Sequence, residues 1–423
     1  MKYFKRVLPN GLTIIEVPSN DAESVVVDFF VKTGSRSETE KENGISHFLE
    51  HFLFKGTQKY PTSLAITELV DSIGAEMNAN TGKEHTQYYI KSHSDHLELI
   101  FQILSDMIQR PMLDPGELER EKGVIVEEIN MYRDMPMAEI DNILENIMWP
   151  GEALGQNIVG SKETVTKFTV DMFRDYMARH YQPGNIILGV SGKFNRKKLD
   201  KLIKEHWGNA PRKQFHKWTK AKDSQKKPRL KVQFKDTEQA HLAMGFKGFP
   251  FGDKRNPAAL ILGAMLGGGM SSRLFTEIRE RRGLAYYVRS NSSSYQDTGV
   301  FYIGAGVQVD KIHEAITVIM GELRKIMTVP VDAKELLKAK EYLKGRTTLA
   351  LEDNQARLDW CIEQQAFHHK IKEPNELFAK IDKVNASQVR EVAENLFKRG
   401  QMSLAVIGPY KNDKMFSKLM KLL

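Results

Sequence analysis

The stretch that decides the fold reads Gly44-Ile45-Ser46-His47-Phe48-Leu49-Glu50-His51-Phe52-Leu53-Phe54. Its apolar residues recur at helical spacing, which predicts a buried helix. Asn43 directly precedes it and is expected to cap its N-terminus. His47 and His51 are four residues apart and therefore project from one face of that helix, and Glu50 borders the same face.

Two imidazoles and a carboxylate on an apolar helix need a chemical reason to be there. A lone buried histidine is usually a satisfied core residue, but three polar groups in one apolar segment cost on the order of several kcal/mol unless something pairs with them. Two histidines at this spacing can share a zinc ion, and the carboxylate between them can reach water at the metal. His-x-x-Glu-His is also the inverted zinc motif. We therefore predict one zinc ion per chain, with His47 and His51 as ligands.

Length and composition indicate a globular protein of two or three domains. The chain has 423 residues, of which 41% are hydrophobic and 27% charged. No apolar run approaches 18 residues, so no membrane span is expected. The N-terminus lacks the apolar core of a signal peptide, and the single cysteine, Cys361, excludes an intrachain disulfide. These features favour a cytoplasmic location.

The net charge of +8 has a largely local origin. Residues 212–229 hold eight Lys or Arg residues against one acidic residue, Asp223. A run of this kind is usually a solvated linker. It is accompanied by no zinc finger, aromatic RNA-binding pattern or phosphate-binding loop, so no nucleic-acid partner is expected.

The pattern of strands and helices occurs twice. Tyr88-Tyr89-Ile90 returns as Phe301-Tyr302-Ile303, and the helix start at Asp114 and Glu117 returns at Asp332 and Glu335. A further capping box is expected at Asp95 and Glu98. The repeat predicts an α+β fold of two homologous α/β-roll domains, each with a mixed or antiparallel sheet and helices packed on one face. The expected boundaries are 1–208, a basic linker at 209–229, and 230–423.

The second copy lacks the candidate metal ligands and the carboxylate of the first. At an offset of 213 residues His47 corresponds to Leu260, Glu50 to Gly263 and His51 to Ala264. We therefore expect residues 1–208 to be the catalytic domain. Residues 230–423 are expected to serve substrate binding and shape.

A catalytic zinc needs a third protein ligand. The helix that begins at Asp114 carries Glu121, Glu127 and Glu128. Glu121 and Glu128 are seven apart and share a face, while Glu127 is turned about 100° away. A solvated acidic face is the alternative explanation of the cluster, and spacing alone leaves Glu127 and Glu128 equal as ligands.

Several motifs together resemble one family. Residues 47–57 are similar to the active helix of the mitochondrial-processing-peptidase-like branch of the pitrilysin (inverzincin) metallopeptidases. Residues 123–129 resemble that family's third-ligand segment, which implies Glu128 as the ligand, and Glu121 matches a supporting acidic position. Asn78 and Ala79 resemble its substrate-binding edge strand.

The second half carries two more similarities. Residues 266–275 resemble the family's glycine stretch, and Arg279 and Tyr286 resemble its Arg–Tyr pair, which implies contact with substrate. A purely structural pair is the alternative. The family resemblance also implies a chamber of four such α+β units that closes around short or unfolded peptides. This chain supplies two units, so the implied assembly is a homodimer, or a heterodimer with an inactive homologue.

The resemblance implies a zinc endopeptidase in which Glu50 is the general base. Two alternatives belong to other classes. One is a non-catalytic subunit like the core proteins of respiratory complexes, which typically lose site residues. The other is a structural zinc scaffold with a fourth protein ligand and no need for Glu50. Retention of all the site residues in this chain argues against the first alternative.

Overall fold

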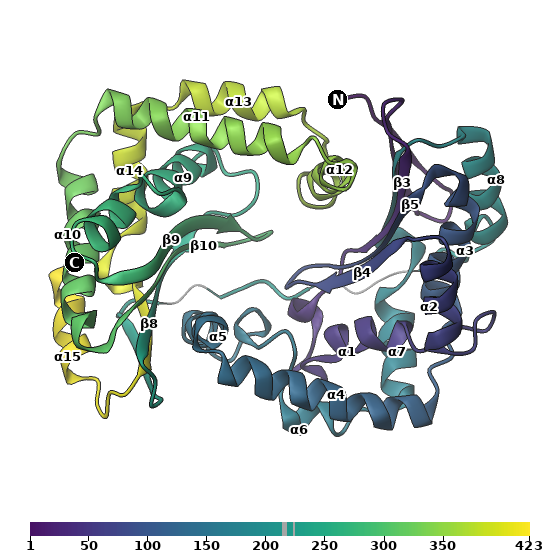
Figure 1. Cartoon of the computed structure of the whole chain (residues 1–423), viewed down its shortest axis with the longest axis horizontal. Helices are drawn as coiled ribbons and strands as arrows, with labels where there is room; N and C mark the ends of the chain where they lie inside the picture. Colours follow the sequence, from purple (N-terminus) through teal and green to yellow (C-terminus); the bar gives the residue numbers. More distant parts are fainter. Residues whose placement is uncertain (214–217, 223–224) are drawn as a thin grey trace. The chain divides into compact units, whose positions relative to one another are not determined.

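The computed structural model describes residues 1–213, 218–222 and 225–423. The chain forms two compact units, each built around one sheet (Figure 1). The first unit contains residues 1–131, 156–219 and 350–371, and the second contains residues 132–155, 220–349 and 372–423. Each unit therefore includes a segment from the other half of the sequence. The expected functional division at residues 208 and 230 stays a prediction.

The first unit has a six-stranded mixed sheet in the order β1-β2-β6-β3-β5-β4. β2 and β6 pair in parallel, and the other neighbours are antiparallel. β3 is buried from Val25 to Val31, because helices cover both faces of the sheet there, so its sequence is nearly continuous in apolar residues. The strands are β1 Phe4–Val7, β2 Thr13–Pro18, β3 Ser24–Val31, β4 Glu76–Thr81, β5 Thr86–His93 and β6 Ile186–Gly192.

Opposite faces of this sheet receive helices from different halves of the chain. On one face Phe29 stacks on Trp207, with ring centroids 5.1 Å apart. On the other face α12 buries Leu358 and Ile362 against β2, β3 and β6. The helices of this unit are α1 Ile45–Leu53, α2 Ser63–Ser72, α3 Leu97–Gln109, α4 Pro115–Asp134, α6 Lys162–Val165, α7 Val170–His180, α8 Arg196–Trp207 and α12 Asn354–His368.

The second unit repeats the strand order of the first. Its sheet runs β7-β11-β8-β10-β9, which matches β2-β6-β3-β5-β4 strand for strand, so the duplication expected from the sequence is confirmed. α5 covers one face of this sheet and buries Leu144 against Ala243 and Ile407. The strands are β7 Arg229–Phe234, β8 Gln239–Gly248, β9 Ala285–Ser294, β10 Gly299–Gln308 and β11 Ser403–Gly408.

Helices of the second unit include two π-helical segments, Ala264–Gly268 and Phe275–Glu280. The first contains Gly267 and Gly268 of the glycine stretch singled out in the sequence. The α-helices are α5 Pro136–Met148, α9 Asn256–Gly263, α10 Ile312–Thr328, α11 Ala333–Ala350, α13 Pro374–Lys383, α14 Ala386–Leu396 and α15 Lys414–Leu419. Across the described ranges, no helix is both long enough and apolar enough to cross a membrane.

Two helix N-terminal caps predicted from the sequence are present in the structure. The Glu117 N–H donates to Asp114 Oδ1 at 2.9 Å and the Glu335 N–H to Asp332 Oδ1 at 3.1 Å, so both predicted caps are confirmed. The capping box expected at Asp95 is wrong, because Asp95 lies inside a 3₁₀ turn, Ser94–His96, and the α-helix begins only at Leu97.

The cap expected at Asn43 is also wrong. Gly44 is the N-cap residue of α1, and its φ of 97° lies in the left-handed region that favours glycine. A Cβ there would meet the Gly160 Cα at 2.8 Å, so the close approach of these two segments also requires glycine. The Asn43 side chain donates instead to the carbonyl oxygen of Asn157 at 2.9 Å.

The basic linker lies partly outside the described residues. Lys217 and Asp223 fall in the two gaps. Of the rest, Gln225 is buried and donates to the carbonyl oxygen of Met402, and Trp218 is half-buried. Most of the described Lys and Arg residues of the stretch are exposed, as expected for a solvated linker, and these two uncharged residues contact the fold.

Candidate metal centre and active site

The helix α1 lies between β4 and α4 (Figure 1). Its start is held by the Glu38 carboxylate, which accepts from the N–H groups of Gly44 and Ser46 at 2.8 Å each. A carboxylate is favoured at a helix N-terminus by the helix dipole. Burial nevertheless raises the pKa of Glu38 to about 7. Along the apolar face, the rings of Phe48 and Phe52 pack on Phe173.

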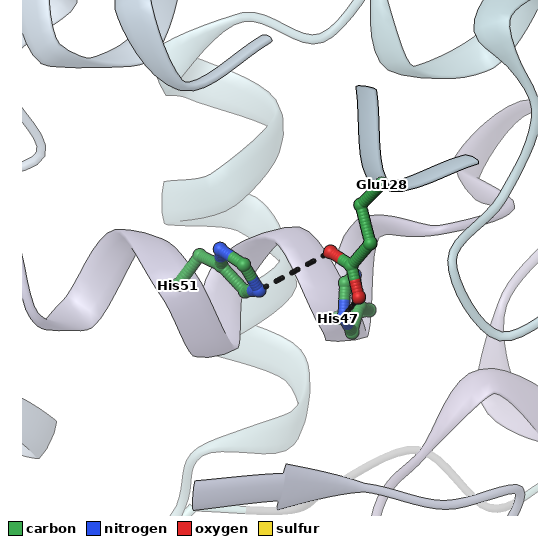
Figure 2. A group of neighbouring side chains, drawn as sticks. All are labelled: His47, His51 and Glu128. Carbon is green, nitrogen blue, oxygen red and sulfur yellow. Dashed lines mark ion pairs between the residues drawn. The ribbon is translucent and has the colours of Figure 1, made fainter. Parts of the chain in front are cut away.

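Three side chains converge on the polar side of α1. His47 Nε2 lies 3.4 Å from Glu128 Oε1, and His51 Nε2 lies 3.5 Å from Glu128 Oε2. Figure 2 shows both rings projecting from one side of α1 toward the carboxylate of Glu128. One possible ligand atom from each residue lies within 4.8 Å of the others. Within residues 1–213, 218–222 and 225–423, this is the one group of His, Cys, Asp or Glu side chains with that property.

The donor set fits zinc. His47 Nε2 and His51 Nε2 face the Glu128 carboxylate, whose Oε2 is buried and has no hydrogen-bond partner in the described part of the chain. Two imidazoles and one carboxylate are the ligands of catalytic zinc sites that keep an open position for water or substrate. A divalent cation would also offset the negative charge of the partly buried Glu128 carboxylate.

Glu121 contacts the side of the His51 ring that faces away from Glu128. Its Oε1 lies 2.9 Å from His51 Nδ1, and its Oε2 lies 2.6 Å from Lys55 Nζ. Burial tends to raise the pKa of the Glu121 carboxyl, but the hydrogen bonds from His51 and Lys55 outweigh burial and lower it. In the same way burial tends to lower the pKa of His51, and its bond to Glu121 and the charge of Glu128 raise it. A histidine ligand is commonly oriented by a carboxylate on its other nitrogen.

The carboxylate of Glu50 contacts the end of β4. Its Oε2 accepts from the Thr81 hydroxyl at 2.5 Å. Sequence reasoning assigned no role to Thr81. The signal available was the period of two along a strand, which puts Thr81 on the same face as Ala79.

The structure separates the two glutamates that spacing left equal. Glu128 lies beside both histidines, whereas Glu127 is exposed and accepts from Asn130 at 3.4 Å. Asn78 and Ala79 lie on β4, the last strand of its sheet, which pairs with β5. The Ala79 N–H donates to Asn78 Oδ1 at 2.8 Å.

Arg279 and Tyr286 lie in the second unit, beside each other. The guanidinium carbon of Arg279 is 5.8 Å from the Tyr286 ring and 4.9 Å from the Phe275 ring. Tyr286 is 74% exposed, so it is free to contact another molecule. A substrate-binding role for this pair stays a prediction.

Comparisons with known proteins agree with this architecture. A model described as insulinase (peptidase family M16) matches residues 14–162, and one described as peptidase M16 inactive domain matches residues 167–343. A protein of Bacillus subtilis, named an uncharacterized zinc protease, is 36% identical over 95% of this chain and 97% of its own length. This chain belongs to the M16 (pitrilysin) peptidase family. The resemblance to the pitrilysin metallopeptidases is thereby confirmed at the level of the family.

Other similar proteins also match almost the whole chain. An uncharacterized zinc protease of Streptomyces coelicolor is 33% identical over 98% of this chain and 91% of its own length. The crystal structure of a protease from Helicobacter pylori matches with a TM-score of 0.90 at 24% identity, over 96% of this chain and 99% of that one. A Pseudomonas fluorescens structure, described as a peptidase M16 inactive domain, matches with a TM-score of 0.88 at 17% identity, over 97% and 99%. These two structures show the fold.

Proposed function

We propose that this M16 protein is a zinc-dependent endopeptidase that hydrolyses peptide bonds in short or unfolded peptides. The observation that carries the proposal is the convergence of His47, His51 and Glu128, with Glu50 on the same helix as the two histidines. Relatives named zinc proteases support it.

His47, His51 and Glu128 would hold one zinc ion per chain, and Glu121 would orient the ring of His51. Bound there, zinc would polarise a peptide carbonyl and lower the pKa of a water molecule toward roughly 7. The buried oxygen Glu128 Oε2, which has no hydrogen-bond partner among the described residues, supports a ligand at this place. Similar ligands accept several divalent ions, so metal analysis of the purified protein identifies the bound ion.

Glu50 moves the proton in this mechanism. It takes a proton from the attacking water as general base and delivers it to the leaving amine as general acid. Its Oε2 is occupied by the hydroxyl of Thr81, so Oε1 is the atom that holds the transferred proton. Thr81 thereby fixes which carboxylate oxygen faces the reaction.

An extended peptide would add to the open edge of β4 at Asn78 and Ala79. Backbone hydrogen bonds dominate such strand addition, so side-chain specificity would be loose. Arg279 and Tyr286 would hold the substrate backbone or stabilise the oxyanion. Four α+β units would enclose the peptide, with two supplied by this chain, as a homodimer or as a heterodimer with an inactive homologue. The proposed setting is cytoplasmic, without a nucleic-acid partner.

The test measures the zinc content and the cleavage of an unstructured peptide, and it compares Glu50→Gln with wild type. Loss of the general base is expected to lower kcat by roughly 10²–10⁴-fold while zinc stays bound. Glu119→Gln, at an exposed position of α4, is the matched control. Full activity in Glu50→Gln would exclude the mechanism. A wild-type protein that binds zinc but cuts nothing, with and without candidate partners, would favour the non-catalytic subunit or the structural zinc scaffold.

A further inference from the structure

Two residues of the stretch between the two halves, both within the first unit, contact a buried cation of that unit. The ring of Trp218 lies 4.1 Å from the guanidinium carbon of Arg36, and the carbonyl oxygen of Thr219 accepts from Arg36 at 3.4 Å. Only 1% of the Arg36 side chain is exposed. These two linker residues therefore form one wall of the pocket around Arg36.

Arg36 is paired with a carboxylate that is equally buried. Its NH1 lies 2.5 Å from Glu84 Oε1, and the Glu84 side chain is 3% exposed. The attraction within such a pair grows as water is excluded, because the local dielectric constant falls. A tryptophan ring over the guanidinium excludes water and adds a cation–π contact. Trp218 is thus expected to strengthen the Arg36–Glu84 pair.

The pair fixes the turn between β4 and β5. Glu84 belongs to this turn, and the backbone N–H of Arg36 donates to the carbonyl oxygen of Lys83 at 2.8 Å. The N–H of Ser35 donates to the carbonyl oxygen of Gly82 at 3.1 Å. Gly34 lies so close that an added Cβ would stand 2.2 Å from the Gly82 oxygen. Backbone and side-chain contacts therefore hold the same turn against residues 34–36.

The turn begins directly after Thr81, whose hydroxyl donates to Glu50. All the residues in this series of contacts, from Trp218 to Glu50, lie within the first unit. We infer that Trp218 is a positioning residue for Glu50, acting through the Arg36–Glu84 pair, the β4–β5 turn and Thr81. This inference rests on the proposed role of Glu50 as general base.

Trp218 variants test the inference better than Arg36 variants. Removing Arg36 would leave Glu84 buried without its cation, a change that commonly prevents stable folding. Trp218 is half-buried, and replacing it by alanine opens the pocket without removing either charge. Trp218→Phe keeps a ring over the guanidinium and serves as the conservative variant. Lys220→Ala, at an exposed position two residues away, is the linker control.

The experiment measures kcat, KM and zinc content with an unstructured peptide, and hydrogen exchange of the backbone amides at residues 35, 36 and 82. For Trp218→Ala we expect kcat to fall about tenfold, equivalent to about 1.4 kcal/mol, with KM and zinc unchanged and with faster exchange at these amides. Trp218→Phe is expected to restore most of kcat, and Lys220→Ala to match wild type. If Trp218 only stabilised the fold, Trp218→Ala would lower the melting temperature but would not lower kcat at unchanged KM.

Two results would overturn the inference. One is unchanged exchange at residues 35, 36 and 82 in Trp218→Ala, which would break the link between the linker and the turn. The other is faster exchange with wild-type kcat, which would break the link between the turn and the base. Failure of the proposed function is distinguishable from both, because it would show as inactivity of the wild-type protein itself or as full activity of Glu50→Gln.

Discussion

His51 Nδ1 lies 2.9 Å from Glu121 Oε1, so a carboxylate of α4 holds the side of the imidazole that faces away from Glu128. Glu121 and Glu128 are two turns apart on the same face of α4, and one ring contacts both. His47 differs, because its Nδ1 is buried and has no hydrogen-bond partner among the described residues. Glu121 therefore fixes the orientation of the His51 ring, whereas no described side chain does the same for His47 Nδ1.

Glu121→Gln is expected to weaken zinc binding by roughly 10–100-fold, because the amide replaces the charged partner that orients His51 and raises its basicity. The measurement is zinc affinity by competition with a chelator at constant pH. Glu119→Gln on the exposed side of the same helix is the control and is expected to bind zinc like wild type. Equal affinities in the two variants would contradict the supporting role.

Glu127 and Glu128 form a matched pair of adjacent carboxylates with different surroundings. Glu128→Gln is expected to lose bound zinc, because the carboxylate nearest both histidines is removed. Glu127→Gln is expected to keep zinc and activity, since Glu127 is exposed and contacts Asn130. Metal analysis of both purified variants checks this. The reverse result would assign the third ligand to Glu127.

Local signals in the sequence were sufficient for much of the fold. Asp114 caps α4 because its partner, the Glu117 N–H, lies three residues away, within reach of any helix start of that type. The two histidines share a face for an equally local reason. The repeat was visible because equivalent residues recur in the sequence at offsets of 213 to 218 residues.

The features that could not be predicted depend on contacts between residues far apart in the sequence, or on backbone conformation. Spacing could not choose between Glu127 and Glu128, because that depends on which face of α4 is turned toward α1. Asn43 was favoured as a cap by its residue type, but Gly44 takes the left-handed conformation and the Glu38 carboxylate supplies the cap from outside the helix. The packing of α12 on the first sheet joins Leu358 to strands more than 160 residues earlier, and no local pattern indicates such a contact.

Stability is expected to fall as pH rises from about 5 to 8. Burial, and then the charge of Asp359, raises the pKa of Asp28 to about 8, whereas an unfolded aspartate ionises near pH 3.9. The folded state therefore binds more protons across this range, and each such group contributes a slope of up to about 1.4 kcal/mol per pH unit. Asp28 accepts from the side chains of Gln87 and Gln355. Asp28→Asn removes this titration.

Urea unfolding at several pH values checks the prediction. The free energy of unfolding of the wild type should decline between pH 5 and 8, and the decline should be smaller in Asp28→Asn. Glu38, whose pKa burial raises to about 7, adds to the slope in both proteins, so part of it persists in the variant. Identical slopes for the two proteins would show that Asp28 is ionised in the folded state throughout.

Thr81→Val is expected to lower kcat by roughly tenfold or more, because a hydrogen bond to a charged group is worth about 1.5–3 kcal/mol. Valine keeps the shape of the threonine and removes only the donor to Glu50. Thr81→Ser retains a hydroxyl and is expected to stay close to wild type. Steady-state kinetics with a peptide substrate, together with zinc analysis, compares the three proteins. Equal kcat for valine and threonine would mean that Glu50 needs no donor from β4.

The exchange of α5 and α12 between the two units has a consequence for synthesis on the ribosome. The last strand of the first sheet ends at Gly192, but the helix that covers one of its faces begins only at Asn354. At typical rates of chain elongation, the intervening roughly 160 residues take about 10–30 s to appear. Throughout that interval the nascent first unit exposes an apolar sheet surface, so a chaperone that binds this surface would protect the half-made protein until α12 emerges.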